Sequence, residues 1–434
     1  MMLQTTETMK KVNTLAFGTV TLLLLGAGQV DAQIPAGPRE LGMGGAYMGV
    51  ARGYESVFLA PANLALLDGP NWSLGFPQVA VGGSVSGPEL TDFIDIVDYD
   101  DLEDSRQDEL LGLFDNGTEG SFAFRAPLLT FSSGSFGLGV SYSALGSHTL
   151  SQDLAELFLE GYEDGRTDYS VGDTYGQRAT FWDFAASYAR NIAGISVGGT
   201  AHYIMPRTLV RTRLFEPQVD LEAQDVTVNY VGVISKGGSG YSVDLGAAFK
   251  PHPSLTVSGA VSNVTSQINW SEDLYVRDFT LDRDIIDNAT PQDILNRYEA
   301  TEAPLDPTAV PLRVFEAAEL LYDEAYLPAV SRLGVAWSPA ARTHIAADVH
   351  NKLTEGRLAE AWDQRISVGV QQSLWILGLR AGYSTANDGG NMVTGGFSLG
   401  PLDVGVAKYQ QKDAGDIATR GWIATFGLGM DQNF

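Results

Sequence analysis

The stretch that decides the fold is the last one, residues 422–434, which read WIATFGLGMDQNF. Its even positions, from Trp422 to Phe434, carry mostly large apolar side chains, whereas its odd positions, ending at Asn433, carry mostly small or polar ones. Side chains two residues apart lie on the same face of a strand. One apolar face and one small, polar face are typical of a membrane β-barrel, in which lipid surrounds the wall and water fills the lumen.

The same alternation recurs along the chain, for instance in residues 136–144, 182–188 and 241–249. Charged residues recur on the small face of such segments. A charge is tolerated in an aqueous lumen, whereas on the lipid face it costs about 2–4 kcal/mol at the middle of the bilayer. We therefore predict an all-β membrane protein, an antiparallel transmembrane β-barrel of about 14 strands. The strands are expected near residues 71–85, 120–131, 135–147, 178–190, 194–216, 240–250, 254–270, 326–338, 342–352, 363–374, 376–386, 391–400, 401–411 and 418–434.

The connections between these segments alternate in length, as they do in outer-membrane barrels. Short turns such as residues 132–134 and 250–253 are expected to face the periplasm. Residues 222–236 also alternate, and we expect them to pair outside the membrane with the upper part of residues 207–216. The long connections, expected outside the cell, are residues 86–119, 146–177 and 271–325. They hold predicted short amphipathic helices at 104–114, 151–158 and 312–322.

Composition excludes several classes of function. The 434 residues include 27 Lys and Arg against 53 Asp and Glu, so the net charge of −26 disfavours binding to nucleic acid. The absence of cysteine excludes disulfides, thiolate metal sites and thiol nucleophiles. The 5 histidines are too scattered for a zinc-hydrolase motif, and no Ser/His/Asp spacing indicates a catalytic triad. We therefore expect no cofactor, no metal and no enzymatic activity.

The N-terminus has the features of an export signal. Lys10 and Lys11 precede an apolar run over residues 12–27, and small residues follow around Ala32. The run is shorter than the roughly 20 residues that a membrane-spanning helix needs. We predict a cleaved signal peptide over residues 1–32, a plug segment over 33–70, and the barrel over 71–434. The expected location is the outer membrane of a Gram-negative bacterium.

The segment after the signal peptide resembles a known family. Residues 39–67 read RELGMGGAYMGVARGYESVFLAPANLALL, which is similar to the N-terminal plug of the FadL-like outer-membrane proteins. The resemblance implies a 14-stranded barrel with a lumenal plug that passively transports a hydrophobic small molecule, such as a long-chain fatty acid. The family's conserved box begins with Asn, whereas this chain has Ala60 there and its amide at Asn63. The plug residues singled out are Gly42, Gly44, Gly45, Pro61 and Asn63.

The middle of the chain resembles a second group. Residues 135–144 (SFGLGVSYSA) and 181–203 (FWDFAASYARNIAGISVGGTAHY) are similar to uncharacterised outer-membrane proteins grouped beside FadL, PorV and TraF-like proteins. This likeness leaves an alternative function open. The protein would then be a non-transporting, PorV-like partner of a secretion or surface-attachment system.

Two sets of charged residues are candidate sites. Arg207, Arg211 and Arg213 alternate along one segment and would either bind an anionic group or pair with Asp220, Glu222 and Asp225. The second set is lumenal by pattern and would either hold the plug by salt bridges or line a transport pathway. Its members are Arg125, Asp183, Asp244, Arg332, Asp348 and Arg380, with His344 and His350.

The expected partners follow from the predicted location. The barrel wall would contact outer-membrane lipid. The loops that hold the acidic residues 98–104 would form a solvated outer face, or alternatively reach lipopolysaccharide through divalent cations or offer an apolar patch that captures a hydrophobic ligand. A hydrophobic small molecule is the expected ligand. The barrel-assembly machinery is the expected partner of the C-terminal strand, because that strand ends in an aromatic residue on its apolar face.

The terminal residue provides a test of this assembly signal. Phe434→Ala should lower the amount of heat-modifiable barrel in the outer membrane, because Phe434 is the last residue on the lipid face. Asn433→Ala is the matched control, since Asn433 lies on the other face and its loss should have little effect. Equal losses from both substitutions, measured by gel shift of outer-membrane fractions, would contradict the prediction.

Overall fold

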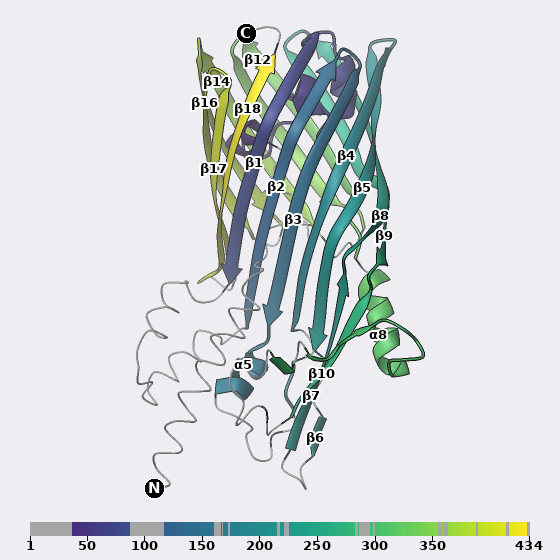
Figure 1. The fold of residues 1–434 in the computed structure, drawn as a ribbon. Helices are drawn as coiled ribbons and strands as arrows, with labels where there is room; N and C mark the ends of the chain where they lie inside the picture. Colours follow the sequence, from purple (N-terminus) through teal and green to yellow (C-terminus); the bar gives the residue numbers. More distant parts are fainter. Residues whose placement is uncertain are drawn as a thin grey trace.

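The computed structural model describes residues 37–86, 117–159, 166, 168–171, 174–214, 218–220, 225–282, 285, 296–297, 300–323, 325–354, 358, 363–387, 389–413 and 416–431. Its main feature is a closed ring of fourteen antiparallel strands, drawn as a tall barrel in Figure 1. Each strand pairs with its neighbours in the ring, and β1 pairs with β18 to close it. The ring consists of β1 (Trp72–Ser86), β2 (Thr118–Ser133), β3 (Phe136–Leu150), β4 (Tyr175–Ile192), β5 (Ile195–Leu214), β8 (Gly237–His252), β9 (Leu255–Glu272), β12 (Val330–Ala340), β13 (Thr343–Lys352), β14 (Gln364–Leu374), β15 (Leu377–Ala386), β16 (Asn391–Leu399), β17 (Leu402–Asp413) and β18 (Asp416–Asp431).

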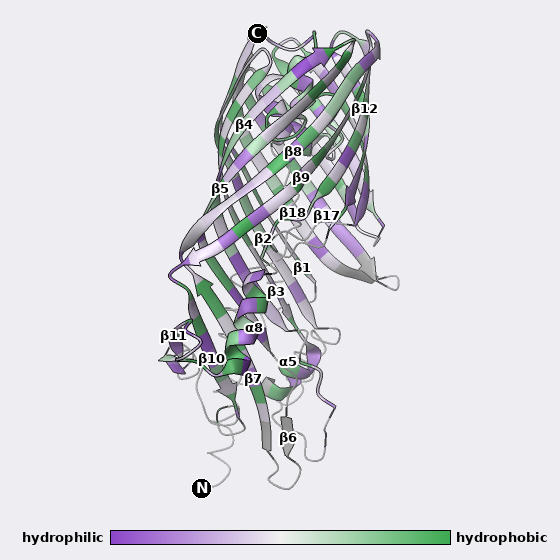
Figure 2. Cartoon of the chain, turned by 90° about the vertical axis from the view of Figure 1, so that its right-hand side faces the viewer, coloured by the Kyte–Doolittle hydropathy of each residue, from purple (hydrophilic) through white to green (hydrophobic). Residues whose placement is uncertain are grey.

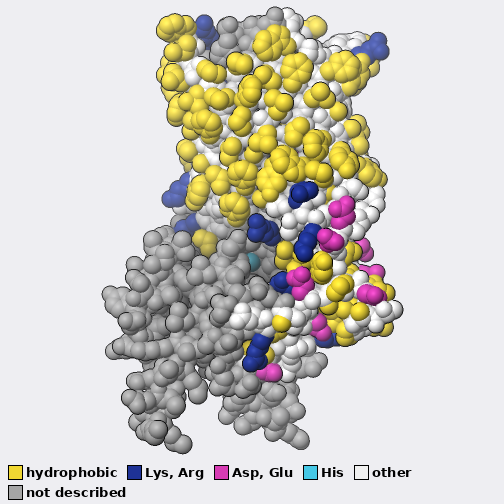
Figure 3. Space-filling model, viewed as in Figure 1, with side chains coloured by type: hydrophobic (Ala, Val, Ile, Leu, Met, Phe, Trp, Pro, Cys, Tyr) yellow, Lys and Arg dark blue, Asp and Glu magenta, His cyan; other side chains and the backbone are white. Residues whose placement is uncertain are grey.

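The fourteen predicted strands are thus confirmed, with ends that move by a few residues. The outward face of the wall is apolar, and Figure 3 shows hydrophobic side chains in a broad band across the face of the barrel in view. Phe136, for example, is 63% exposed, whereas its neighbour across the pleat, Gly137, is buried. An exposed apolar belt of this kind matches a lipid environment. Among the described residues, no helix is long and apolar enough to cross a membrane.

The N-terminal segment lies inside the ring, at the end where the strand connections are short (Figure 1). It consists of α2 (Pro38–Gly42), two 3₁₀ turns, η1 (Gly53–Ser56) and η2 (Pro61–Ala65), and the loops between them. Most of its side chains are buried, including Leu41 and Met48 at 0% exposure. We call residues 37–70 the plug.

A second unit extends beyond the other end of the barrel, as Figures 1 and 2 show. It contains β6 (Gln218–Asp220), β7 (Asp225–Ser235), β10 (Tyr275–Leu281), β11 (Glu302–Pro304) and α8 (Leu312–Asp323), and we call it the outer unit. β7 pairs with the last residues of β5, Leu209–Leu214, which confirms the pairing predicted for residues 222–236. α8 confirms the predicted helix at 312–322, and it buries Val314, Ala318 and Leu321 against β7 and β10.

Another predicted helix is also present, as α5 (Gln152–Leu159) in the connection between β3 and β4. Ser151 caps its first turn, because the backbone N–H of Leu154 donates to the Ser151 Oγ at 3.4 Å. The third predicted helix, at 104–114, and the acidic residues 98–104 lie outside the described residues, as does the signal peptide.

The wall is interrupted at one place between β1 and β2. Their pairing runs from Trp72 to Gly75 and resumes only at Ala80, which lies opposite Arg125. Between these pairs, residues 76–79 and 126–129 make no ladder pair with each other, and we call this the wall interruption. Each side contains a proline, Pro77 or Pro127, which has no N–H to donate to a neighbouring strand.

The topology can be tested with single cysteines because the native chain contains none. Pro307 is exposed beside the outer unit, and Pro253 is exposed in the short turn between β8 and β9. A membrane-impermeant maleimide added to intact cells should therefore label Pro307→Cys and leave Pro253→Cys unlabelled until the outer membrane is permeabilised. The reverse pattern would invert the barrel.

Candidate functional site

The plug approaches the barrel wall closely through its glycines. Gly44 has a φ of 69°, and a Cβ there would lie 2.8 Å from the backbone nitrogen of Tyr383 on β15. A Cβ on Gly42 would lie 3.3 Å from the Cα of Gly396 on β16. Gly45 has a φ of 86° and lies beside the guanidinium of Arg365. A side chain at Gly44 would therefore meet both backbone strain and the wall.

Two polar side chains hold the backbone of the plug. The carboxylate of Asp348, on β13 and 1% exposed, accepts hydrogen bonds from the backbone N–H groups of Tyr47 and Met48 at 2.8 and 2.9 Å. Asn63 donates from Nδ2 to the carbonyls of Met48 and Ala51 and accepts from Ser258 of β9 at 2.8 Å. The amide of Asn63 therefore binds the plug to itself and to the wall. Pro61 occupies the first position of η2, where a missing N–H is tolerated.

Ion pairs add to this attachment. Arg39 of α2 lies 2.8 Å from Asp403 of β17, which also pairs with Arg380 at 2.9 Å. Glu40 of α2 pairs with Arg332 of β12 at 3.0 Å. These pairs are nearly buried, so losing one partner would leave an uncompensated charge in the lumen.

The plug is also tied to the wall where it leaves the lumen. Asp68 binds Arg52 of the plug and Lys250 at the end of β8, with distances of 3.0 and 2.6 Å. Partial burial raises the pKa of the Asp68 carboxyl, but hydrogen bonds and charges from Arg52 and Lys250 outweigh this effect and lower it to about 2.

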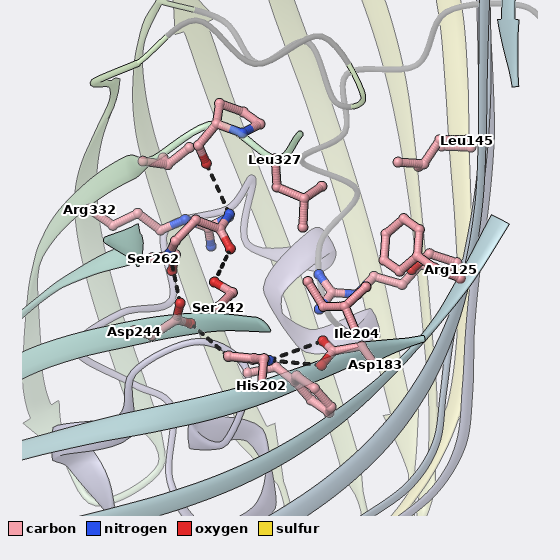
Figure 4. Close-up of a pocket in the computed structure, with 17 residues that line it drawn as sticks. Arg125, Leu145, Asp183, His202, Ile204, Ser242, Asp244, Ser262, Leu327 and Arg332 are labelled. Atoms are coloured by element: carbon pink, nitrogen blue, oxygen red, sulfur yellow. Dashed lines mark hydrogen bonds and ion pairs between the residues drawn. The ribbon is translucent and has the colours of Figure 1, made fainter. Parts of the chain in front are cut away.

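Beyond the plug, the lumen contains a cavity of about 140 Å³, shown in Figure 4 and called the chamber here. Phe58 of the plug forms part of its lining, and Leu327 and Pro328, which precede β12, line it as well. The other apolar lining includes Leu145, Phe181 and Ile204. The charged and ionisable lining consists of Arg125, Asp183, His202, Asp244 and Arg332.

His202 of β5 lies between two carboxylates. Its Nδ1 is 2.9 and 3.1 Å from the two carboxylate oxygens of Asp183, and its Nε2 is 3.3 Å from Asp244. Asp244 also accepts the backbone N–H of Asn263 at 2.8 Å, and the Asn263 side chain donates to the carbonyl of Pro328 at 2.9 Å. This series of contacts connects four wall strands, β4, β5, β8 and β9, to the segment that lines the chamber from the side of the outer unit (Figure 4).

A smaller cavity of about 20 Å³ lies behind the wall interruption. Gln78 and Pro127 of the wall line it, together with Tyr54 and Phe58 of the plug. Phe58 therefore lines both cavities and lies between the chamber and the wall interruption.

The six predicted lumenal residues all face the interior, but they do not form one network. Arg125, Asp183, Asp244 and Arg332 line the chamber, whereas Asp348 holds the plug backbone and Arg380 pairs with Asp403. His350 lies apart from the chamber and accepts a hydrogen bond from Arg365 at 2.8 Å. His344 contacts Ser338 near the start of β13.

Arg207 does not share a face of β5 with Arg211 and Arg213, which corrects the interpretation of the three as one row. A bulge in β5 at the register shift opposite Thr180 and Phe181 leaves Arg207 without a ladder partner and exposed. An extra residue reverses the alternation beyond it, so Arg211 is buried and donates to the carbonyl of Leu321 in α8. Arg213 is exposed. The side chains of their alternative partners, Asp220, Glu222 and Asp225, lie outside the described residues, as does Phe434.

Sequence reasoning missed several residues of the site. His202 was treated only as one of the scattered histidines, although it lies two residues from Ile204 on the inward face of a predicted strand. Glu40 and Asp403, the partners of Arg332 and Arg380, were not singled out either. Within the described part of the chain, no cluster of His, Asp and Glu has a geometry suited to a metal ion.

Comparison of the fold with solved structures shows clear likenesses. The Pseudomonas putida toluene transporter TodX matches 91% of this chain and 98% of its own, with 12% identity and a TM-score of 0.51. The fold is that of the FadL-like barrels. The Ralstonia pickettii toluene transporter TbuX matches 91% and 98% of the two chains, with 14% identity and a TM-score of 0.51. A FadL homologue of Pseudomonas aeruginosa matches 93% and 99%, with 12% identity and the same TM-score of 0.51.

No family model and no curated protein matches the sequence. The FadL-like resemblance of residues 39–67 therefore agrees with the fold of the whole barrel, while the identities of 12% to 14% concern architecture alone.

The Asp348 contacts with the plug give a first prediction for this site. Asp348→Ala removes the carboxylate oxygen that accepts both backbone N–H groups, and leaving a buried donor unsatisfied typically costs about 1–3 kcal/mol. Amide hydrogen exchange in residues 43–48 should therefore speed up while the barrel strands stay protected. Asp363→Ala is the control, because Asp363 makes its 2.8 Å pair with Lys352 at 67% exposure. Similar exchange in both variants would show that the contact is not what holds the plug.

The Asp68 contacts predict a dependence on pH. Because the folded pKa of Asp68 is depressed to about 2, the contact stabilises the plug exit above the ordinary value of 3.8 and is lost as the pH falls toward 2. Pepsin should therefore spare the Leu66–Leu67 bond at about pH 4 and cut it near pH 2. Asp68→Asn should be cut under both conditions, and resistance of this variant at the higher pH would contradict the assignment.

Proposed function

We propose that the protein is an outer-membrane channel through which a small hydrophobic molecule passes passively. The observation that carries the proposal is the position of Phe58, which lines both the chamber and the cavity behind the wall interruption. The outward side of the interruption is apolar, with Phe76, Leu128 and Leu129 each 38% to 45% exposed. A molecule that displaces the Phe58 ring would move from the chamber to the wall and leave sideways into lipid, while the plug stays in place.

The size of the chamber favours a compact molecule. An apolar cavity of about 150 Å³ in another protein binds benzene, and the chamber has a similar volume of about 140 Å³. A long-chain fatty acid would fit only with part of its length. The solved channels TodX and TbuX are described as toluene transporters, which supports a small hydrophobic substrate class for this fold.

The arrangement of the chamber supports a channel rather than an enzyme. A histidine that activates a serine needs one ring nitrogen within reach of the hydroxyl. Both nitrogens of His202 instead face carboxylates, those of Asp183 and Asp244. His202, the histidine that lines the chamber, is thus engaged with two carboxylates.

The alternative is a PorV-like role as a partner of a secretion or surface-attachment system. Two observations favour it. The plug is held at several points, through Asp348, Asn63 and the Arg39–Asp403 pair. The outer unit also has its own small hydrophobic core, formed by β7, β10 and α8, and offers an ordered surface beyond the barrel.

Permeation through liposomes separates the two proposals. Phe58→Ala should increase the flux of a neutral aromatic solute such as toluene, because it joins the two cavities, and Phe58→Trp should reduce it. Leu41→Ala is the matched control, since it creates a comparable cavity in the plug but packs against Met392 and Ala407, away from the chamber.

Equal increases from Phe58→Ala and Leu41→Ala would mean that loosening of the plug, and not the Phe58 route, controls the flux. If none of these proteins conducts above empty liposomes, the partner role becomes the better proposal.

A further inference from the structure

The chamber contains one cation whose charge the described part of the protein does not pair. Arg125 of β2 reaches inward from the wall (Figure 4) and makes no hydrogen bond or ion pair with any described residue. Its guanidinium carbon lies 5.5 Å from the centre of the Phe58 ring. A cation over an aromatic face is stabilised only modestly, by about 0.5–2 kcal/mol.

The nearby carboxylates are already engaged. Asp183 and Asp244 both face His202, and Asp244 accepts a backbone N–H in addition. Glu40 pairs with Arg332 at 3.0 Å. Asp183, Glu40 and Asp244 act on the Arg125 charge only from beyond ion-pair distance, so the N–H groups of Arg125 remain available to an anion from outside the chain.

The rest of the lining is suited to an aromatic ring. Phe58 and Phe181 line the chamber, and the rings of Phe58 and His202 lie 6.2 Å apart. Aromatic rings pack well in tilted and offset arrangements at such distances. The volume of about 140 Å³ leaves room for one ring with a small substituent.

We propose that the chamber binds a monoaromatic carboxylate, with the ring against Phe58 and the carboxylate on Arg125. The planar guanidinium matches a carboxylate through two parallel hydrogen bonds, which are among the stronger polar contacts in proteins. A neutral hydrocarbon would instead cover the Arg125 charge without pairing it, which is unfavourable. This proposal specifies a substrate class for the proposed channel, and it therefore rests on the proposed function.

The net charge of −26 does not oppose such a ligand strongly. Exposed charges are screened beyond roughly 8 Å at physiological salt, whereas a cation inside the lumen acts at contact distance.

Binding to the purified full-length protein tests the proposal. Benzoate and its neutral counterpart benzamide would be titrated calorimetrically at pH 7, where the benzoate carboxyl group is ionised. The wild-type protein should prefer benzoate. Arg125→Gln should weaken benzoate binding by roughly tenfold or more and leave benzamide unchanged, because one charge-assisted contact is lost. Arg125→Lys should retain much of the benzoate affinity, and Arg190→Gln, exposed near the end of β4, should retain all of it.

Equal benzoate affinity in the wild type and Arg125→Gln, or equal affinity of the wild type for benzoate and benzamide, would overturn the proposal. If Arg125→Gln does not form a heat-modifiable barrel, the wild-type preference between the two ligands decides alone. This experiment is separate from the test of transport. Toluene flux without benzoate binding would refute only the carboxylate site, whereas benzoate binding without any flux would refute only the channel.

Discussion

The rest of the structure depends on the requirement that every backbone N–H and C=O in a membrane find a partner within the protein. Strands meet this requirement only in a closed ring, since an open edge would place unpaired groups in lipid. The pairing of β1 with β18 provides that closure. A ring of fourteen strands encloses an interior wide enough to need filling, and the plug fills it at one end. The polar contacts of the plug follow from this, because a lumen lined with small and polar side chains offers hydrogen bonds and charges more readily than apolar surface.

The same requirement gives the wall interruption its significance. Pro77 and Pro127 cannot donate to a neighbouring strand, so the sequence itself weakens the ladder between β1 and β2 at the level of the plug. An interior cavity lies behind it, and apolar side chains lie outside it. A closed wall and a lateral path are opposing demands. Under the proposed function, the protein would meet both by confining the irregular pairing to a few residues, with one aromatic ring, Phe58, behind them.

Most of the fold could be predicted from the sequence, because a strand between lipid and water has a period of two residues that few other structures share. The pairing of residues 222–236 outside the membrane could also be predicted, since that segment has no place in an even ring. The side-chain contacts could not. The bulge at Arg207 reverses the alternation on which the arginine site was based. Pro206 beside it is a signal for irregular strand pairing, but it does not show which residue is left unpaired. The engagement of His202 by Asp183 and Asp244 depends on the register of three strands, β4, β5 and β8, which pattern alone leaves open.

β5 links the two ends of the molecule mechanically. Its first half, up to Ile204, pairs with β8 in the barrel, and its last residues, Leu209–Leu214, pair with β7 in the outer unit. A pull on the outer unit along the barrel axis would load the β5–β7 hydrogen bonds in shear, with many bonds sharing the force at once. That load continues through one covalent backbone to His202 and the chamber wall. Tension applied to the outer unit would therefore reach the chamber wall through the continuous backbone of β5, with the bulge at Arg207 between the two sets of pairings.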